Sequence, residues 1–355
     1  MLTEFPLAPE SPLGNPAPLW FILLFKVLGF TLHLVPMHLW FAGMVLVALF
    51  SLFGGEHARR LAHRLVSVMP ILIALGVNFG IVPLLFIQVA YYPVVYPANI
   101  LIGWFWFAVI PLLLVAYYGA YYYAVQVRQE RVDGRGVTAG VVSAIAFLLI
   151  GFIFANNFSL MTNREQMLAL YDRTNVAGAV TGTALNLNDP TLLPRYLMMF
   201  GLALTTTAVF VMVDAAFFGK GESEAYRTWA ARRAVWLYAV GVVWFAVMGA
   251  WYLFGTLRPD VRAAAQADPR ILTLFTLTAV SPGIVWLLLW RAAKWRAGDV
   301  FGAAAAQVIV LALNAMSRQW VQNVELAPFF DPAQLTVKTQ WSPMIAFLAL
   351  LVVGV

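Results

Sequence analysis

A long apolar run near the start of the sequence, PLWFILLFKVLGFTLHLVPMHLWFAGMVLVALFSLF, occupies residues 18–53. Its only charged residue is Lys26, and it contains no acidic side chain. Because a helix crosses a bilayer with about 20 apolar residues, this run is longer than one simple crossing requires. Pro36 lies inside the run and favours a kinked or tilted helix.

Similar apolar runs recur along the whole chain. Eight more segments have this character: 68–95, 97–124, 137–160, 195–218, 234–254, 271–290, 299–317 and 342–355. Hydrophobic residues make up 62% of the sequence and charged residues 11%, whereas a soluble domain carries about 25% charged residues. The sequence therefore predicts an all-α membrane bundle of about nine transmembrane helices, formed as one domain by residues 1–355. This composition excludes a soluble globular or disordered chain, and the basic loops are explained by membrane topology rather than by nucleic acid.

Lysine and arginine in the connecting loops predict the orientation. Thirteen of them lie in the loops of one side and eight, spread over longer loops, on the other. The positive-inside rule then places the N-terminus outside and the C-terminus inside. Residues 1–17 are expected to form an irregular outer lead-in, and the outer loops 161–194 and 318–341 to form a cap or docking surface.

Histidine is the residue type to examine first for cofactor chemistry. His57 and His63 lie in a basic inner loop and are expected to be solvated. His33 and His38 lie in the first span, where ionisable side chains indicate function by default. A neutral histidine can ligate haem iron, and the alternative is a hydrogen bond to a neighbouring helix.

Geometry limits the kinds of haem site that this chain can form. Two histidines on one helix cannot approach one iron from opposite sides, so His33 and His38 cannot form a bis-histidine site alone. Met198 and Met199, in the fifth span, are the candidate second ligands, and packing is the alternative role for both. The sequence contains no cysteine, which excludes thiolate metal sites, iron–sulfur clusters and covalently attached c-type haem on this chain.

Other polar side chains within or near the spans are candidates for contact with a quinone or a haem propionate. They are Lys26, Asn78, Gln88, Asn156, Asn157 and Arg318. Each has an alternative role: snorkelling for the lysine, interhelical hydrogen bonds for the amides and interfacial anchoring for the arginine. Asp214, near the inner end of the fifth span, is expected to pair with Arg232 or Arg233. No other carboxylate is expected well inside a span, which argues against a pump built on a chain of acidic relays.

Four features occur in a fixed order on the expected spans. They are histidine close to Val35-Pro36, then Gly76-Val77-Asn78-Phe79, then Phe154-Ala155-Asn156-Asn157, and finally Ser317-Arg318-Gln319 followed by Val324-Glu325-Leu326-Ala327-Pro328. With nine spans and an outside N-terminus, this arrangement resembles subunit I of the cytochrome bd-type quinol oxidase superfamily. The corresponding stretches in the family read Gly-Ile-Asn-Phe, Val-Ala-Asn-Gly, Gly-Arg-Gln-Pro-Trp and Glu-Val-Leu-Pro.

The chain also departs from that family at its functional residues. The third-span glutamates of the family would fall on Gly103 and Pro111, and its haem-ligating glutamate near Ala315. Its fifth-span haem histidine would fall on Met198 or Met199, and its long quinol loop is reduced here to about residues 255–270. The first-span histidine corresponds to His33 by neighbourhood, with His38 as second choice. The resemblance thus implies the fold but not oxygen reduction.

Three functional interpretations follow. The first is a divergent subunit of a respiratory electron-transfer complex that oxidises quinol. It would bind a b-type haem, and its substrate would be quinone or menaquinone. It would exchange electrons with a partner on the outer face, a multihaem c-type cytochrome. The second is a cofactor-free anchor for a redox complex. The third is a transporter, which would require broken helices and an internal repeat.

Overall fold

The computed structural model describes residues 4–293 and 297–354. Eight helices in this part of the chain are long and apolar enough to cross a membrane. They are α1 Leu19–Phe53, α2 Glu56–Ala90, α4 Gly103–Arg128, α5 Gly134–Met161, α7 Leu192–Val213, α8 Glu224–Ala250, α10 Pro269–Ala292 and α11 Ala297–Leu326. Helices α7 and α8 continue as the π-helical turns η1 Asp214–Phe218 and η2 Trp251–Thr256. These helices and the shorter apolar α12, Trp341–Gly354, take the nine predicted places, so the predicted all-α membrane bundle is confirmed.

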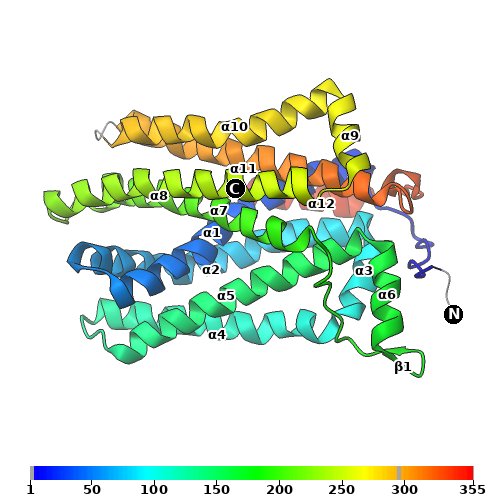
Figure 1. Cartoon of the computed structure of the whole chain (residues 1–355), viewed down its shortest axis with the longest axis horizontal. Helices are drawn as coiled ribbons and strands as arrows, with labels where there is room; N and C mark the ends of the chain where they lie inside the picture. The colour runs from blue at the N-terminus through cyan, green and yellow to red at the C-terminus, as the bar shows by residue number, and fades with distance from the viewer. Residues whose placement is uncertain (1–3, 294–296, 355) are drawn as a thin grey trace.

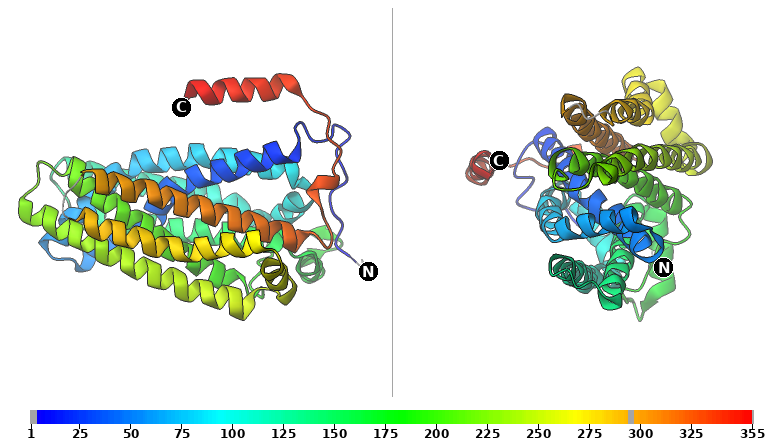
Figure 2. Two further views of the ribbon diagram at one scale, coloured as in Figure 1. Left: turned by 90° about the horizontal axis from the view of Figure 1, so that it is seen from above. Right: turned by 90° about the vertical axis from the view of Figure 1, so that its left-hand side faces the viewer.

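The short elements gather at one end of the bundle, called here the cap end (Figure 1). They are α3 Tyr92–Leu101, α6 Arg164–Thr174, the hairpin of β1 Asn175–Val176 and β2 Ala179–Val180, α9 Pro259–Ala267 and the 3₁₀ turn η3 Pro332–Gln334. The lead-in also lies at this end: the Asn15 N–H donates to the Thr336 carbonyl at 2.7 Å, and the Lys338 N–H donates to the Asn15 carbonyl at 2.9 Å. Helix α12 starts at the cap end and runs beside the bundle toward the opposite end (Figure 2).

Helix α1 is the central element of the bundle. It packs against α2, α5, α7 and α11, and 61% of its most apolar stretch is buried, compared with 11% for α4. Small side chains allow the close contact between α1 and α2: a Cβ atom at Gly29 would lie 2.7 Å from Cγ1 of Val82. Polar groups carried by α1 are therefore held inside the protein, whereas α4 presents most of its apolar surface outward.

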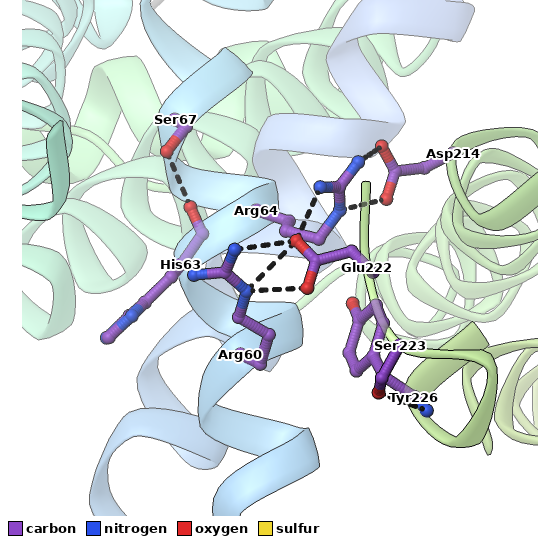
Figure 3. A network of polar contacts seen from close by, with 8 residues as sticks. All are labelled: Arg60, His63, Arg64, Ser67, Asp214, Glu222, Ser223 and Tyr226. Atoms are coloured by element: carbon purple, nitrogen blue, oxygen red, sulfur yellow. Dashed lines mark hydrogen bonds and ion pairs between the residues drawn. The ribbon is translucent and has the colours of Figure 1, made fainter. Parts of the chain in front are cut away.

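An ion-pair network joins α2 to the connection between α7 and α8 at the opposite end (Figure 3). The Arg64 guanidinium donates to both carboxylate oxygens of Asp214, at 2.6 and 2.7 Å, and to Glu222 at 3.0 Å. Arg60 donates to Glu222 at 2.7 Å. The expected partners of Asp214, Arg232 and Arg233, were therefore wrong. The reason is that Asp214 opens the π-helical turn η1 and faces α2, while the Arg233 guanidinium lies over aromatic rings of α8.

Stability at acid pH is expected to depend on Glu222, which lies between two spans. Hydrogen bonds from Arg60, followed by the charges of Arg60 and Arg64, hold the pKa of Glu222 below its ordinary value of about 4.5. A carboxyl whose pKa is lower in the folded state contributes stability above its unfolded pKa, and this contribution is lost as the pH falls through the folded value. We expect the melting temperature of the wild type to fall below about pH 4.5, and the Glu222→Gln variant to lose less over the same interval. Parallel melting curves of the two proteins would contradict this assignment.

Candidate functional site

His33 is held in a defined tautomer by α2. Its Nδ1 lies 2.8 Å from the carbonyl oxygen of Gly76. A carbonyl only accepts hydrogen bonds, so Nδ1 carries the proton and Nε2 keeps its lone pair. The ring fits because residue 80 is glycine: a Cβ atom there would lie 2.8 Å from Cε1 of His33. The Gly76–Gly80 stretch therefore forms a seat for this imidazole.

The Gly80→Ala variant tests this seat. An alanine inside a helix usually stabilises it by roughly 0.5–1 kcal/mol relative to glycine. At position 80 the methyl group would displace the His33 ring and its hydrogen bond, which contributes about 1 kcal/mol. We expect Gly80→Ala to be less stable than the matched Gly302→Ala, because a Cβ at Gly302 meets nothing within 4 Å. Thermal unfolding in detergent measures the difference, and equal stability of the two variants would contradict the proposed fit.

His38 is fully buried and is also tied through Nδ1. That atom lies 2.8 Å from Oγ1 of Thr206. The Thr206 hydroxyl donates its only proton to the Leu202 carbonyl at 3.2 Å, and it accepts from Nε2 of Gln307 at 3.1 Å. Its remaining lone pair therefore accepts from Nδ1–H of His38. Nε2 of His38 is left with a free lone pair and finds no hydrogen-bond partner in the part of the chain that the structure describes.

The hydrogen bonds around His38 continue across the bundle. Oε1 of Gln307 accepts from the Tyr238 hydroxyl at 2.7 Å, and Nε2 of Gln307 also donates to Thr205 at 3.0 Å. Side chains of α1, α7, α8 and α11 are thus linked in one buried polar chain. Three residues of this chain are not among the candidates that the sequence indicates: Thr206, Gln307 and Tyr238. The available signal was Gln307, one of two amides inside the eighth span, together with three successive threonines in the fifth.

Both first-span histidines meet one requirement of an axial haem ligand. A metal-binding imidazole usually donates from its other ring nitrogen to a fixed acceptor, which sets the tautomer. The Gly76 carbonyl and the Thr206 hydroxyl are such acceptors. Among the described residues no group of three or more His, Cys, Asp or Glu side chains gathers into a metal site, so the fit is to a single imidazole ligand.

The candidate methionine ligands lie side by side on α7 with different neighbours. Sδ of Met199 lies 4.0 Å from Nη1 of Arg318. Sδ of Met198 lies 3.5 Å from the position that a Cβ of Gly249 would take. Of the two methionines, Met199 is therefore the one that contacts Arg318 on α11.

Lys26 and Arg318, two of the predicted quinone contacts, belong to one group of side chains between α1, α7 and α11. We call it the basic cluster; it consists of Lys26, Arg195, Arg318, Gln319, Gln322 and Glu325. The Lys26 ammonium donates to Oε1 of Gln319 and, at 3.0 Å, to Oε1 of Gln322. It also lies 4.6 Å from the centre of the Tyr91 ring. Only 8% of Lys26 is exposed, so it is an interior residue and does not snorkel to the surface.

The neighbours that contact the Arg318 guanidinium are uncharged: an aromatic ring and a methionine sulfur. Its Cζ lies 5.3 Å from the centre of the Phe30 ring, and the His33 ring is tilted against the same phenylalanine. Arg195, by contrast, forms an ion pair with Glu325. Glu325 is 5% exposed because α11 continues to Leu326, eight residues beyond Arg318. In the sequence this carboxylate falls within the expected outer loop 318–341, so it is not among the candidate site residues.

The other predicted quinone contacts lie apart from the basic cluster. Asn78 is exposed and donates to the Ala74 carbonyl of its own helix, and Gln88 is half-buried farther along α2. Asn156 and Asn157 are buried, and they tether the cap. Oδ1 of Asn156 accepts from the Asn186 N–H at 3.1 Å, and Nδ2 of Asn157 donates to Asn99 at 2.8 Å.

Two hollows on the bundle surface are unrelated to these groups. One of about 470 Å³ lies beside Gly103, Trp104 and Gly182, and one of about 440 Å³ lies beside Gly119 and Arg135. Neither is lined by a histidine or by a member of the basic cluster. The polar interior, rather than these hollows, is therefore the candidate site.

Comparison with known proteins identifies the architecture. No family model and no curated protein matches this sequence. A chain in the solved structure of bd oxidase from Geobacillus thermodenitrificans matches the fold with a TM-score of 0.55 and 14% sequence identity. The match covers 96% of this chain and 95% of the other. The resemblance to the bd-type family is thus confirmed at the level of the fold: this chain is a divergent membrane bundle with a bd oxidase-like fold.

Proposed function

We propose that this chain is an integral membrane subunit of a respiratory electron-transfer complex in a bacterial cytoplasmic membrane. It exchanges electrons between membrane quinol or quinone and a multihaem c-type cytochrome that docks at the cap end, on the periplasmic side. The activity assigned to the complex is that of a quinol-oxidising, cytochrome-reducing oxidoreductase. Oxygen reduction is not part of the proposal, because glycine, proline and alanine stand where the resemblance would require glutamates.

One observation carries this proposal. Within a bd oxidase-like fold, both histidines of the central helix have Nδ1 fixed by a hydrogen bond and an Nε2 lone pair left over. A b-type haem, when bound, would supply one-electron transfer, and His33 or His38 would hold its iron through Nε2. Met198 and Met199 remain the proposed candidates for the second ligand.

The chain's own residues have defined tasks in this proposal. The Gly76 carbonyl and the Thr206 hydroxyl keep the proton on Nδ1 of each histidine. Lys26 and Arg318 are the proposed hydrogen-bond donors to a quinone oxygen. Quinol oxidation releases two protons with its two electrons, and a site nearer the cap end would leave these protons on that side.

A visible difference spectrum tests the function. The protein is purified with its partners, and spectra are recorded for the wild type, His33→Ala, His38→Ala and the control His57→Ala. We expect a b-type band in the wild type and in the control, and its loss in one of the two first-span variants. The absence of such a band from the wild type would overturn the haem assignment. Quinone in the lipid extract would then favour the alternative role of a cofactor-free anchor.

A further inference from the structure

We propose that the basic cluster binds an ionised oxygen on the head group of a membrane-soluble quinone-type ligand, with Lys26 and Arg318 as its counter-charges. This inference rests on the proposed function and specifies the chemical form of its substrate. A neutral quinone needs only hydrogen-bond donors, whereas this cluster also supplies charge.

The charges of the cluster do not balance. It contains three cationic side chains and one carboxylate, and that carboxylate, Glu325, is paired with Arg195. Within residues 4–293 and 297–354, neither Lys26 nor Arg318 forms an ion pair with an acidic side chain. Unpaired charges inside a membrane protein are costly and mark ligand or ion sites. An anionic ligand oxygen would provide the missing counter-charge.

The hydrogen bonds leave more donors than acceptors available, since Nε of Arg195 and Nε2 of Gln322 find no partner among the described residues, and neither does one acceptor, Oε2 of Glu325. Gln319 and Gln322 both turn their amide oxygens toward Lys26, which leaves one ammonium proton for a further acceptor. The hydrogen bond described for the Arg318 guanidinium goes to a methionine sulfur, a weak acceptor. The cluster therefore keeps hydrogen-bond donors on α1 and α11 available for an acceptor of a bound ligand.

The depth and the apolar neighbours favour a quinone-type head group over a phospholipid. Lys26 lies seven residues from the start of α1 and Arg318 eight residues from the end of α11. At 1.5 Å per residue, both lie roughly 10–12 Å inside the cap-end termini of their helices. The Phe30 ring and the Met199 thioether border the same arginine and suit a flat ring. A phospholipid phosphate shares the anionic chemistry but would have to pass between the helices to reach Lys26, which is only 8% exposed.

Two probes of nearly the same shape but different charge show whether charge contributes to binding. The full chain in detergent is titrated with 2-hydroxy-1,4-naphthoquinone, which is ionised at neutral pH, and with the uncharged 2-methoxy analogue, and quenching of tryptophan fluorescence reports binding. We expect the ionised probe to bind at least about tenfold more tightly, in line with charge-assisted hydrogen bonds. The Lys26→Met and Arg318→Met variants should each lose most of this preference. The matched control Lys338→Met, at an exposed position of the cap end, should keep it.

A charge-removing variant keeps the test valid if the methionine variants fold poorly. Glu325→Gln leaves Arg195 unpaired and increases the positive charge of the cluster, so it should bind the ionised probe more tightly than the wild type does. Misfolding cannot produce such a gain, and an unchanged or weaker affinity of a folded Glu325→Gln variant would overturn the proposal.

The other possible results distinguish a failure of the anionic site from a failure of quinone binding itself. Equal affinity of the wild type for the two probes would overturn the anionic site while leaving quinone binding intact. Binding of neither probe would contradict both. Displacement of the ionised probe by phosphatidylglycerol vesicles, but not by phosphatidylcholine vesicles, would assign the anionic oxygen to a lipid phosphate and overturn the quinone assignment.

Discussion

Replacing Arg64 by methionine is expected to lower the free energy of unfolding by about 3 kcal/mol, because removing one partner of a buried ion pair leaves its carboxylates uncompensated. Arg64 contacts both Asp214 and Glu222, and the side chains of Arg64 and Asp214 are only 19% and 12% exposed. The network joins α2 to the end of α7 and the start of α8, so the loss should appear as a lower melting temperature in detergent. A chemical denaturation curve of the same sample gives the magnitude.

The control for this prediction is Arg59→Met, which removes an exposed arginine from the same helix and should change the stability by less than about 0.5 kcal/mol. In the double variant Arg64→Met with Asp214→Leu, part of the loss should be recovered, since two apolar groups can replace a buried pair at little net cost. If Arg64→Met melts together with Arg59→Met, the network does not hold these helices together.

Substituting leucine for Gly241 is expected to produce a second large loss, of about 3 kcal/mol or more. A Cβ atom at Gly241 would lie 2.9 Å from the Gly201 carbonyl oxygen and 3.0 Å from the Thr205 amide nitrogen. Both are backbone atoms of α7, so the added side chain can be accommodated only by moving α7 and α8 apart. That movement would also disturb Thr205 and Thr206, which carry the hydrogen bonds leading to His38.

Gly302→Leu is the matched control, since a Cβ there meets nothing within 4 Å. It should yield a monodisperse protein with nearly wild-type stability, whereas Gly241→Leu should aggregate or melt at a clearly lower temperature. Equal yields and melting temperatures for the two variants would contradict the close packing of α7 on α8.

The places of the eight long apolar helices could be predicted from the sequence, because a helix that crosses the hydrocarbon of a bilayer needs an apolar run of about 20 residues. The ends of the helices could not. Helix α2 begins at Glu56 and α11 ends at Leu326, well beyond the predicted segments 68–95 and 299–317. Polar residues also form helix outside the hydrocarbon, so hydropathy marks the membrane-facing part of a helix and not its termini.

The candidate site was predictable where a residue type is rare in membranes and not where partners come from distant helices. Lys26 and Arg318 were selected as unusual residues, but their shared cluster with Glu325 depends on the extension of α11. The predicted partner of Asp214 was wrong because this residue opens a π-helical turn and its carboxylate faces Arg64 of α2. Thr206 and Gln307 were missed because threonine and a lone amide are ordinary in transmembrane helices, where they often bond to other helices.

Electron transfer from quinol is the decisive assay of the proposed role. The complex containing this chain is reconstituted in liposomes without oxygen, and its visible spectrum is followed after addition of a menaquinol analogue. We expect reduction of a b-type chromophore by the quinol, slowed at least about tenfold in a folded Arg318→Met variant. Reduction by dithionite but not by quinol, or no spectral change with either reductant, would contradict it.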